Sequence, residues 1–144
     1  MTRVDFYVLR GHDRLERLLL ICKLAEKAVG RGQKVFIYSQ NDDDLRDLDT
    51  SLWDFRAMSF VAHQLIEPGR LLSSTDSDPV HLSGGEPGMD RNLLINLELD
   101  VPSFFSRFER TLEVVNEDPA IQTPGRNRYR FYKQRGYPLQ HHKM

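Results

Sequence analysis

Apolar positions along this chain occur either in short unbroken runs or at helical spacing. Residues 4–9 and 35–38 are rich in aromatic and β-branched side chains, which is typical of strands. Between them lies an amphipathic segment with apolar residues every three or four positions, at Leu15, Leu18, Leu19, Cys22 and Ala25. Asp13, with Glu16 three residues later, predicts the N-terminus of this helix, and Gly30 and Gly32 predict its end.

A second helix is predicted directly after the run at 35–38. Three acids at positions 42–44 suit a helix N-terminus, where the helix dipole stabilises negative charge. Leu45, Leu48 and Leu52 then recur on one face, which we expect to point inward. The order strand, helix, strand, helix predicts an α/β fold with a parallel sheet.

The middle of the chain is less regular. Residues 79–82 and 92–97 read as strands, and 111–115 reads as the last strand, whereas 59–63 is either a short strand or a connection. The stretch 67–78 is rich in Ser, Asp, Pro and Gly, which predicts a surface loop. Phe104, Phe105 and Phe108 mark a short amphipathic piece after Pro102.

A basic helix is predicted at 123–136, followed by a frayed tail that contains His141 and His142. Thr123 is a suitable N-cap, Pro124 suits the first helical position, and Gly136 suits the residue after the C-cap. A helical wheel gathers one cationic stripe with a tyrosine at its border and leaves two arginines on another side. The stripe comprises Arg126, Tyr129, Arg130 and Lys133, and the second side comprises Arg128 and Arg135.

Charge separates this end from the rest of the chain. The net charge of the 144 residues is −1, but residues 119–144 hold six Lys and Arg and no acid, which leaves −7 for residues 1–118. The length predicts one domain, residues 1–144. A single cysteine, Cys22, excludes an internal disulfide and fits a core thiol. No apolar run approaches twenty residues and the N-terminus lacks signal-peptide character, so cytoplasmic residence is the expectation.

Nucleotide, metal and catalytic motifs are missing from the sequence. Neither G-x-G-x-x-G nor G-x-x-x-x-G-K-[ST] follows a predicted strand, and the acids at 42–44 would repel a phosphate there. No histidine pair has the spacing of a metal site, and no G-x-S-x-G is present. We therefore expect no cofactor, no metal and no catalytic residue. A binding module is favoured over an enzyme.

Three interpretations of the basic helix remain open from the residues alone. It is a solvated counterweight to an acidic body, a site for single-stranded nucleic acid, or a site for a short acidic peptide. Arginine and tyrosine suit nucleic acid through phosphate pairing and base stacking. They equally suit a peptide, whose carboxylates pair with arginines while an aromatic residue walls an apolar pocket. A compact basic site on an acidic body fits the short anion better than a long polyanion.

Several segments resemble the chi subunit family of bacterial DNA polymerase III. L-D-T-S-L-W at 48–53 matches that family's L-D-x-x-L-W, and R-N-R-Y-R-F-Y-K at 126–133 matches its R-x-R-Y-[KR]-x-Y-[KR]. The segments 6–9, 32–37 and 92–97 are similar to that family's opening strand, its lysine-marked second strand and its late buried strand, and 59–63 follows the matched L-D-x-x-L-W helix end. Just before 126, this chain has Q-T-P-G where some relatives have a helical segment containing lysine.

This resemblance implies a noncatalytic accessory subunit of the replicase with a Rossmann-like fold that lacks the nucleotide-binding loop. Members bridge the psi subunit of the clamp loader to the acidic C-terminal tail of single-stranded DNA-binding protein, which ends in a Phe carboxylate. The resemblance places the tail site at Arg126, Tyr129 and Arg130, with Lys133 and Arg128 as weaker additions. It places the psi-facing surface near Trp53 and Phe60. Contact with single-stranded DNA would then be indirect, and no membrane is involved.

Overall fold

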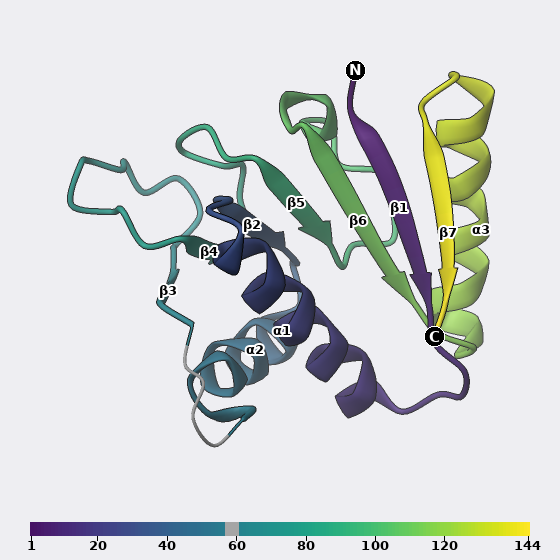
Figure 1. Cartoon of the computed structure of the whole chain (residues 1–144), viewed down its shortest axis with the longest axis horizontal. Helices are drawn as coiled ribbons and strands as arrows, with labels where there is room; N and C mark the ends of the chain where they lie inside the picture. Colours follow the sequence, from purple (N-terminus) through teal and green to yellow (C-terminus); the bar gives the residue numbers. More distant parts are fainter. Residues whose placement is uncertain (57–60) are drawn as a thin grey trace.

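Seven strands form one parallel sheet in the computed structural model, which describes residues 1–56 and 61–144 (Figure 1). The strand order is β3-β4-β2-β5-β6-β1-β7, and every neighbouring pair is parallel. The elements in chain order are β1 Arg3–Val8, α1 Arg14–Gly30, β2 Val35–Tyr38, α2 Asp42–Asp54, β3 His63–Leu65, β4 Val80–Ser83, β5 Leu93–Asn96, the 3₁₀ turn η1 Phe105–Arg107, β6 Arg110–Val115, α3 Pro119–Gln134 and β7 Leu139–Lys143. The predicted α/β, Rossmann-like class is confirmed.

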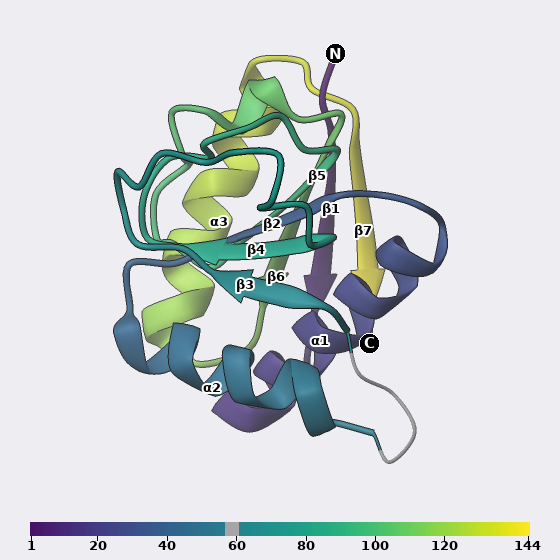
Figure 2. The ribbon, with the colours of Figure 1, turned by 90° about the vertical axis from the view of Figure 1, so that its left-hand side faces the viewer.

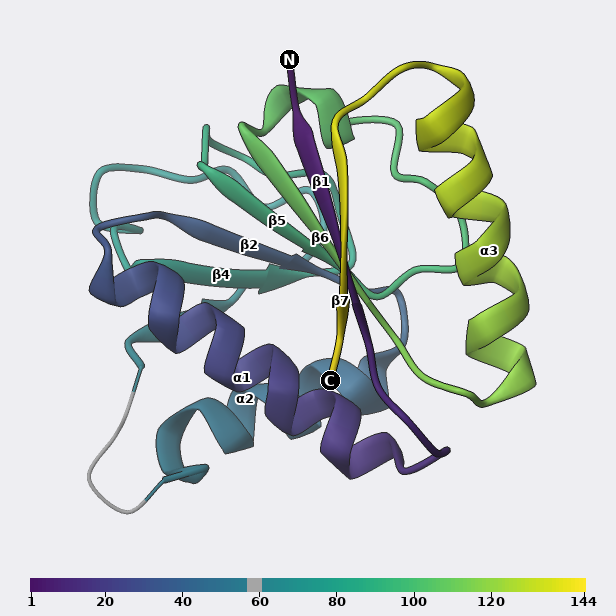
Figure 3. The same ribbon diagram turned by 45° about the vertical axis from the view of Figure 1, so that its right-hand side comes forward.

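The helices cover the sheet unequally. Helices α1 and α2 lie on one face and α3 lies on the other, beside β1 and β7 (Figures 1 and 3). The α1–α2 side is packed with aliphatic residues, whereas the α3 side is largely aromatic, with Phe36, Phe105 and Tyr132 among its members. Buried apolar surface of this extent is what holds the three layers together.

Most of the predicted features of α1 and α2 are confirmed. The Asp13 carboxylate accepts from the N–H of Leu15 (2.8 Å), and the Asn41 side chain accepts from Asp44 N–H (3.0 Å), so both helices are capped. Cys22 is fully buried, and burial raises the pKa of its thiol to about 12, which confirms a core thiol. Leu15 and Leu19 are exceptions. They are 65% and 36% exposed, because they lie one turn apart on a side of α1 that the sheet does not cover.

The start of α3 differs from the prediction. The helix begins at Pro119 with Asp118 as its N-cap, whose carboxylate accepts from Ala120 N–H (3.0 Å), and Pro124 lies inside it. Both Pro119 and Pro124 are compatible with an early helical position, and the prediction chose the later one. Pro124 removes one helical hydrogen bond near the N-terminal end, where the five preceding residues, 119–123, still form helix. The basic stripe is therefore preceded by a full additional turn.

The C-terminal tail also differs from the prediction. Residues 139–143 form β7, which pairs in parallel with β1 along its full length, from Val4↔Leu139 to Val8↔Lys143. On one face the His142 ring stacks on Tyr7 at 4.5 Å, and its Nε2 lies 3.0 Å from Asp5 Oδ1. Two predictions are therefore wrong: 111–115 is not the last strand, and the C-terminal end is not frayed. The sequence of β7 is polar, which is compatible with an edge strand that pairs with one neighbour only.

The opposite edge of the sheet is the short strand β3, which faces the viewer in Figure 2. The strand begins at His63, later than the predicted segment 59–63, part of which lies outside the described residues. Residues 67–78 form the predicted loop, and Asp76 organises it by accepting from Gln64, Arg70 and the Ser73 N–H. These hydrogen bonds, that from the Arg70 guanidinium above all, hold the pKa of Asp76 well below its usual range.

Candidate functional site

A pocket of about 530 Å³ lies between the N-terminal half of α3 and the strands beneath it. Four elements contribute its walls: strand β1, the end of β6, helix α3, and the edge strand β7. Its lining residues are Phe6, Val8, Val115, Asn116, Gln122, Gly125, Arg126, Tyr129, Arg130 and His141. Three residues of the predicted site, Arg126, Tyr129 and Arg130, are thus brought together in one hollow.

The floor of the pocket is apolar. Phe6 and Val115 are buried and Val8 is partly buried, and all three point to the α3 face of the sheet. Gly125 lets the helix approach this floor, because a Cβ added there would meet Val115 Cγ1 at 2.9 Å. Tyr129 packs edge-on against Phe6 with ring centroids 5.2 Å apart, which forms an aromatic wall. An apolar side chain of a ligand finds a hydrophobic surface here.

The rim of the pocket is cationic. Arg126 and Arg130 are exposed, and neither forms an ion pair with any residue in the described parts of the chain. Arg130 donates to the Asn127 side chain one turn earlier. Lys133 is exposed on the same helical stripe, beyond the residues that line the pocket. The arrangement joins an apolar cavity to guanidinium groups that are available for carboxylates.

Arg128 lies elsewhere, in the interior. Its Nε donates to Glu113 Oε1 (2.9 Å) and its Nη1 donates to the Leu99 carbonyl (2.9 Å), with 3% of the side chain exposed. Glu113 also accepts from Tyr132 Oη (2.8 Å) and from Asn96 Nδ2. We therefore remove Arg128 from the binding surface. The helical wheel places Arg128 away from the stripe, but it does not show that Arg128 is buried and paired with Glu113.

The network around Glu113 anchors α3 to the middle of the sheet. Burial is the largest influence on Glu113 and raises the pKa of its carboxyl, while the Arg128 charge and three donated hydrogen bonds oppose that effect. Burial also raises the pKa of Tyr132, whose hydroxyl stays a donor. Arg135, the other arginine off the stripe, stacks over the Phe131 ring at 3.8 Å. The second basic side thus consists of one buried anchor and one cation–π contact.

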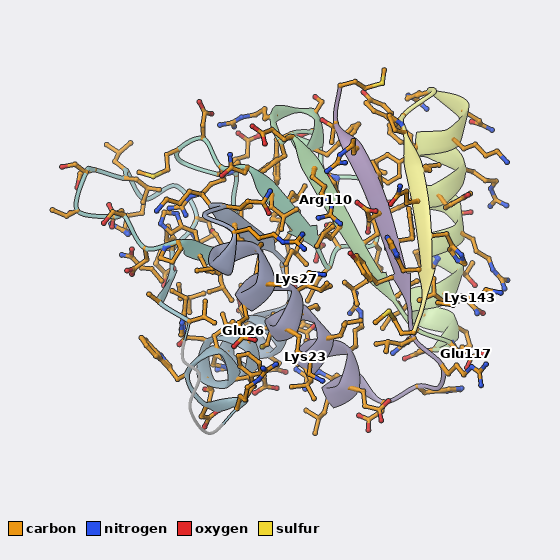
Figure 4. The ribbon with its side chains drawn as sticks, in the orientation of Figure 1. Lys23, Glu26, Lys27, Arg110, Glu117 and Lys143 are labelled. Atoms are coloured by element: carbon orange, nitrogen blue, oxygen red, sulfur yellow. The ribbon has the colours of Figure 1, made fainter. Side chains whose placement is uncertain are left out.

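Some lining residues carry no recognisable signal in the sequence. Gln122 lines the pocket because α3 begins before it, at Pro119. His141 lines the pocket because residues 139–143 form strand β7. Glu117 follows the end of β6, and its carboxylate accepts from the Gly11 N–H. Lys23, Lys27 and Arg110 lie on the opposite face of the sheet from α3 (Figure 4).

The family resemblance predicts Trp53 and Phe60 at the psi-facing surface, and the structure describes Trp53. It is 51% exposed on α2 and contacts the His63 ring, with centroids 4.3 Å apart. Phe60 lies outside the described residues. Leu65 and Leu71 add further exposed apolar surface at this edge, at 41% and 92%.

Metal and membrane features complete the survey of sites. Within residues 1–56 and 61–144, no three His, Cys, Asp or Glu side chains gather as a metal ion would require. In the same ranges, no helix has the length and apolar character to cross a membrane.

Comparison with known proteins relates the chain to replication proteins. The family model for "DNA polymerase III chi subunit, HolC" matches residues 1–140. DNA polymerase III subunit chi of Pseudomonas aeruginosa is 44% identical over 146 residues, covering 100% of this chain and 98% of that protein. The subunits chi of Haemophilus influenzae and Escherichia coli K12 are 29% and 26% identical, covering 94% and 96% of this chain and 92% and 96% of theirs.

A solved structure shares the fold alone. The crystal structure of T4 UvsW superposes with a TM-score of 0.64 at 8% identity, covering 99% of this chain and 41% of that one. At that identity the likeness concerns the arrangement of strands and helices. The family match, which spans nearly all of the sequence, is of a different kind: this chain belongs to the DNA polymerase III chi subunit family.

Proposed function

We propose that this DNA polymerase III subunit is a noncatalytic adaptor, and that its α3 pocket binds the acidic C-terminal tail of single-stranded DNA-binding protein. The observation that carries the proposal is the pairing of an apolar floor with the exposed Arg126 and Arg130, which form no ion pair within residues 1–56 and 61–144. A peptide that ends in acidic residues and a terminal Phe offers the matching chemistry. Its ring fits the floor beside Tyr129, and its carboxylates fit the guanidinium forks.

The size of the pocket agrees with this ligand. About 530 Å³ accommodates an aromatic side chain and its neighbours, and small-ligand pockets of roughly 300–1,000 Å³ are common. Residues 1–118 carry a net charge of −7, so the basic helix is where we expect an acidic peptide to be attracted most strongly. Binding is expected to weaken as salt rises, because exposed charges are screened within about 10 Å at 0.1 M ionic strength.

The test is a titration with a labelled peptide that ends in Asp-Asp-x-x-Pro-Phe, followed by fluorescence anisotropy. Arg126→Ala and Arg130→Ala are each expected to weaken binding about tenfold or more, because a hydrogen-bonded charge pair is lost. Arg135→Ala is the matched control: it removes the same charge from the same helix, but its guanidinium stacks on Phe131. Equal affinities for all three variants and the parent would refute the site.

Direct binding of single-stranded nucleic acid by the basic helix is the competing function. A titration with bare single-stranded DNA at physiological salt separates the two. The adaptor proposal expects no sub-micromolar affinity there, since only a few phosphates can pair with the exposed cations of α3. Sub-micromolar binding that Arg126→Ala abolishes would favour the competing function.

We further propose that the β3 edge binds the psi subunit of the clamp loader. Support comes from three exposed apolar side chains in this part of the fold: Trp53 on α2, Leu65 on β3 and Leu71 in the loop that follows β3. Exposed apolar side chains are typical of protein–protein contacts. Trp53→Ala is expected to lower copurification with psi at least tenfold while leaving peptide affinity unchanged. Unchanged psi copurification would refute this surface.

A further inference from the structure

Asn116, the first residue after β6, lines the α3 pocket and is 2% exposed. Its Oδ1 accepts from Asp118 N–H (3.0 Å), the residue that caps α3. This bond fixes the orientation of the amide and leaves Nδ2 as a donor. Among the described residues, Nδ2 finds no acceptor. A buried amide donor therefore stands beside the pocket without a partner.

A donor of this kind needs an explanation. Leaving a buried N–H unsatisfied forfeits its hydration without a compensating bond, so proteins rarely do so without cause. Two other buried atoms in the described chain also have no partner, Arg91 Nε and Thr111 Oγ1, but neither residue lines this pocket. Asn116 alone of the three belongs to a cavity whose floor is apolar and whose rim is cationic.

We propose that Asn116 Nδ2 donates to the terminal carboxylate of the peptide that the α3 pocket binds. The inference rests on the proposed function and assigns the two kinds of carboxylate to different groups. The α-carboxylate is attached to the residue whose side chain fills the pocket, so it lies near the buried end. The acidic side chains that precede it remain nearer the surface, where Arg126 and Arg130 are exposed.

The chemistry of the site supports this division. A carboxylate accepts about four hydrogen bonds, so one amide donor does not compete with an arginine for the same group. A neutral donor next to Phe6 and Val115 also avoids the cost of burying a second charge there. Asn116 thereby selects a free chain end over an internal aspartate or glutamate, whereas the arginines on the rim accept either.

The experiment compares two peptides of the same sequence, one with a free C-terminal carboxylate and one with a C-terminal amide, on the parent chain and on Asn116→Asp. The variant keeps the acceptor for Asp118 N–H but replaces the donor with a carboxylate oxygen. The parent is expected to prefer the free acid, and Asn116→Asp to reduce that preference about tenfold or more. The amide peptide, which offers its own donor, should bind the variant as well as the parent or better.

Gln140→Glu is the matched control, because it adds the same charge on β7 at a position that faces away from α3, beside Asp5. It should leave the acid-to-amide ratio unchanged. If Asn116→Asp melts early, Asn116→Ala provides the same readout, with an expected loss of preference and no added charge. An acid-to-amide ratio equal in the parent and both variants overturns the inference and points to a bound water as the acceptor. Failure of the parent to bind the free acid at all would instead refute the proposed function.

Discussion

The two edges of the sheet expose different kinds of side chain. At the β7 edge, α3 buries its apolar and aromatic side chains and exposes guanidinium groups around a hollow. At the β3 edge, leucines and a tryptophan stay exposed around a short strand, and charged groups are drawn inward, as Asp76 shows. The chain thus places its exposed arginines at one edge of the sheet and its exposed apolar side chains at the other. Under the proposed function, the β7 edge binds a short acidic peptide with an apolar end, and the β3 edge binds the apolar face of a protein.

The largest expected effect concerns the anchor of α3. Glu113→Ala leaves Arg128 buried without its carboxylate, so the free energy of unfolding should fall by about 3–5 kcal/mol. Urea denaturation followed by circular dichroism measures it. Glu109→Ala, which removes an exposed carboxylate from the same segment, should change stability by less than about 0.5 kcal/mol. Similar losses in both variants would mean that the network does not anchor the helix.

The next effect concerns pH and the β3 half of the sheet. His81 on β4 is buried beside Arg91, and burial is the main cause that lowers its pKa to about 4. Between pH 6.5 and 4 the unfolded chain therefore binds more protons at His81 than the folded chain does. Stability should fall as pH drops through this window, by roughly 3 kcal/mol at most.

The measurement is urea denaturation at pH values from 7 to 4. The parent titrates other groups too, so the informative quantity is the difference between the parent and His81→Gln, which carries no titrating ring. That variant should show a flatter dependence on pH. Identical slopes in the two proteins would remove His81 as a cause.

A smaller effect tests how closely α3 must approach the sheet. In Gly125→Ala the new Cβ meets Val115 Cγ1 at 2.9 Å, which costs about 1–3 kcal/mol of packing strain against a gain of about 1 kcal/mol in helix propensity. We expect a net loss near 1 kcal/mol and weaker peptide binding. Adding Val115→Ala should relieve the clash, so the double variant should be less destabilised than the two single effects combined.

The smallest effect on stability is expected at the β3 edge. Leu71 is 92% exposed, so Leu71→Ser should change the free energy of unfolding by less than about 0.5 kcal/mol. Under the proposed function it should still reduce psi copurification. A large stability loss would show that Leu71 packs against the body of the protein and is not a contact surface.

Local patterns determined much of this structure. The cap Asp13, the inward leucines of α2, and the runs that became β2, β5 and β6 follow from spacing and side-chain chemistry alone. Three residues of the pocket, Arg126, Tyr129 and Arg130, were predicted because they share one helical stripe and match a family motif. The start of α3 was missed because two prolines and two caps compete within seven residues, 118–124, and local rules do not rank them.

By itself the sequence determined that the protein is an α/β sheet with an acidic body and a basic, aromatic-edged C-terminal helix. The tertiary structure alone decided which arginines of α3 are exposed and which are buried. Arg126 and Arg128 are two positions apart on one helix, yet one faces solvent and the other meets Glu113 in the core. It also decided that a polar tail becomes β7 and adds His141 to the pocket, and that Asn116 stands beside that pocket. The physical reason is that burial, and the partner a charge finds, depend on contacts between residues distant along the chain.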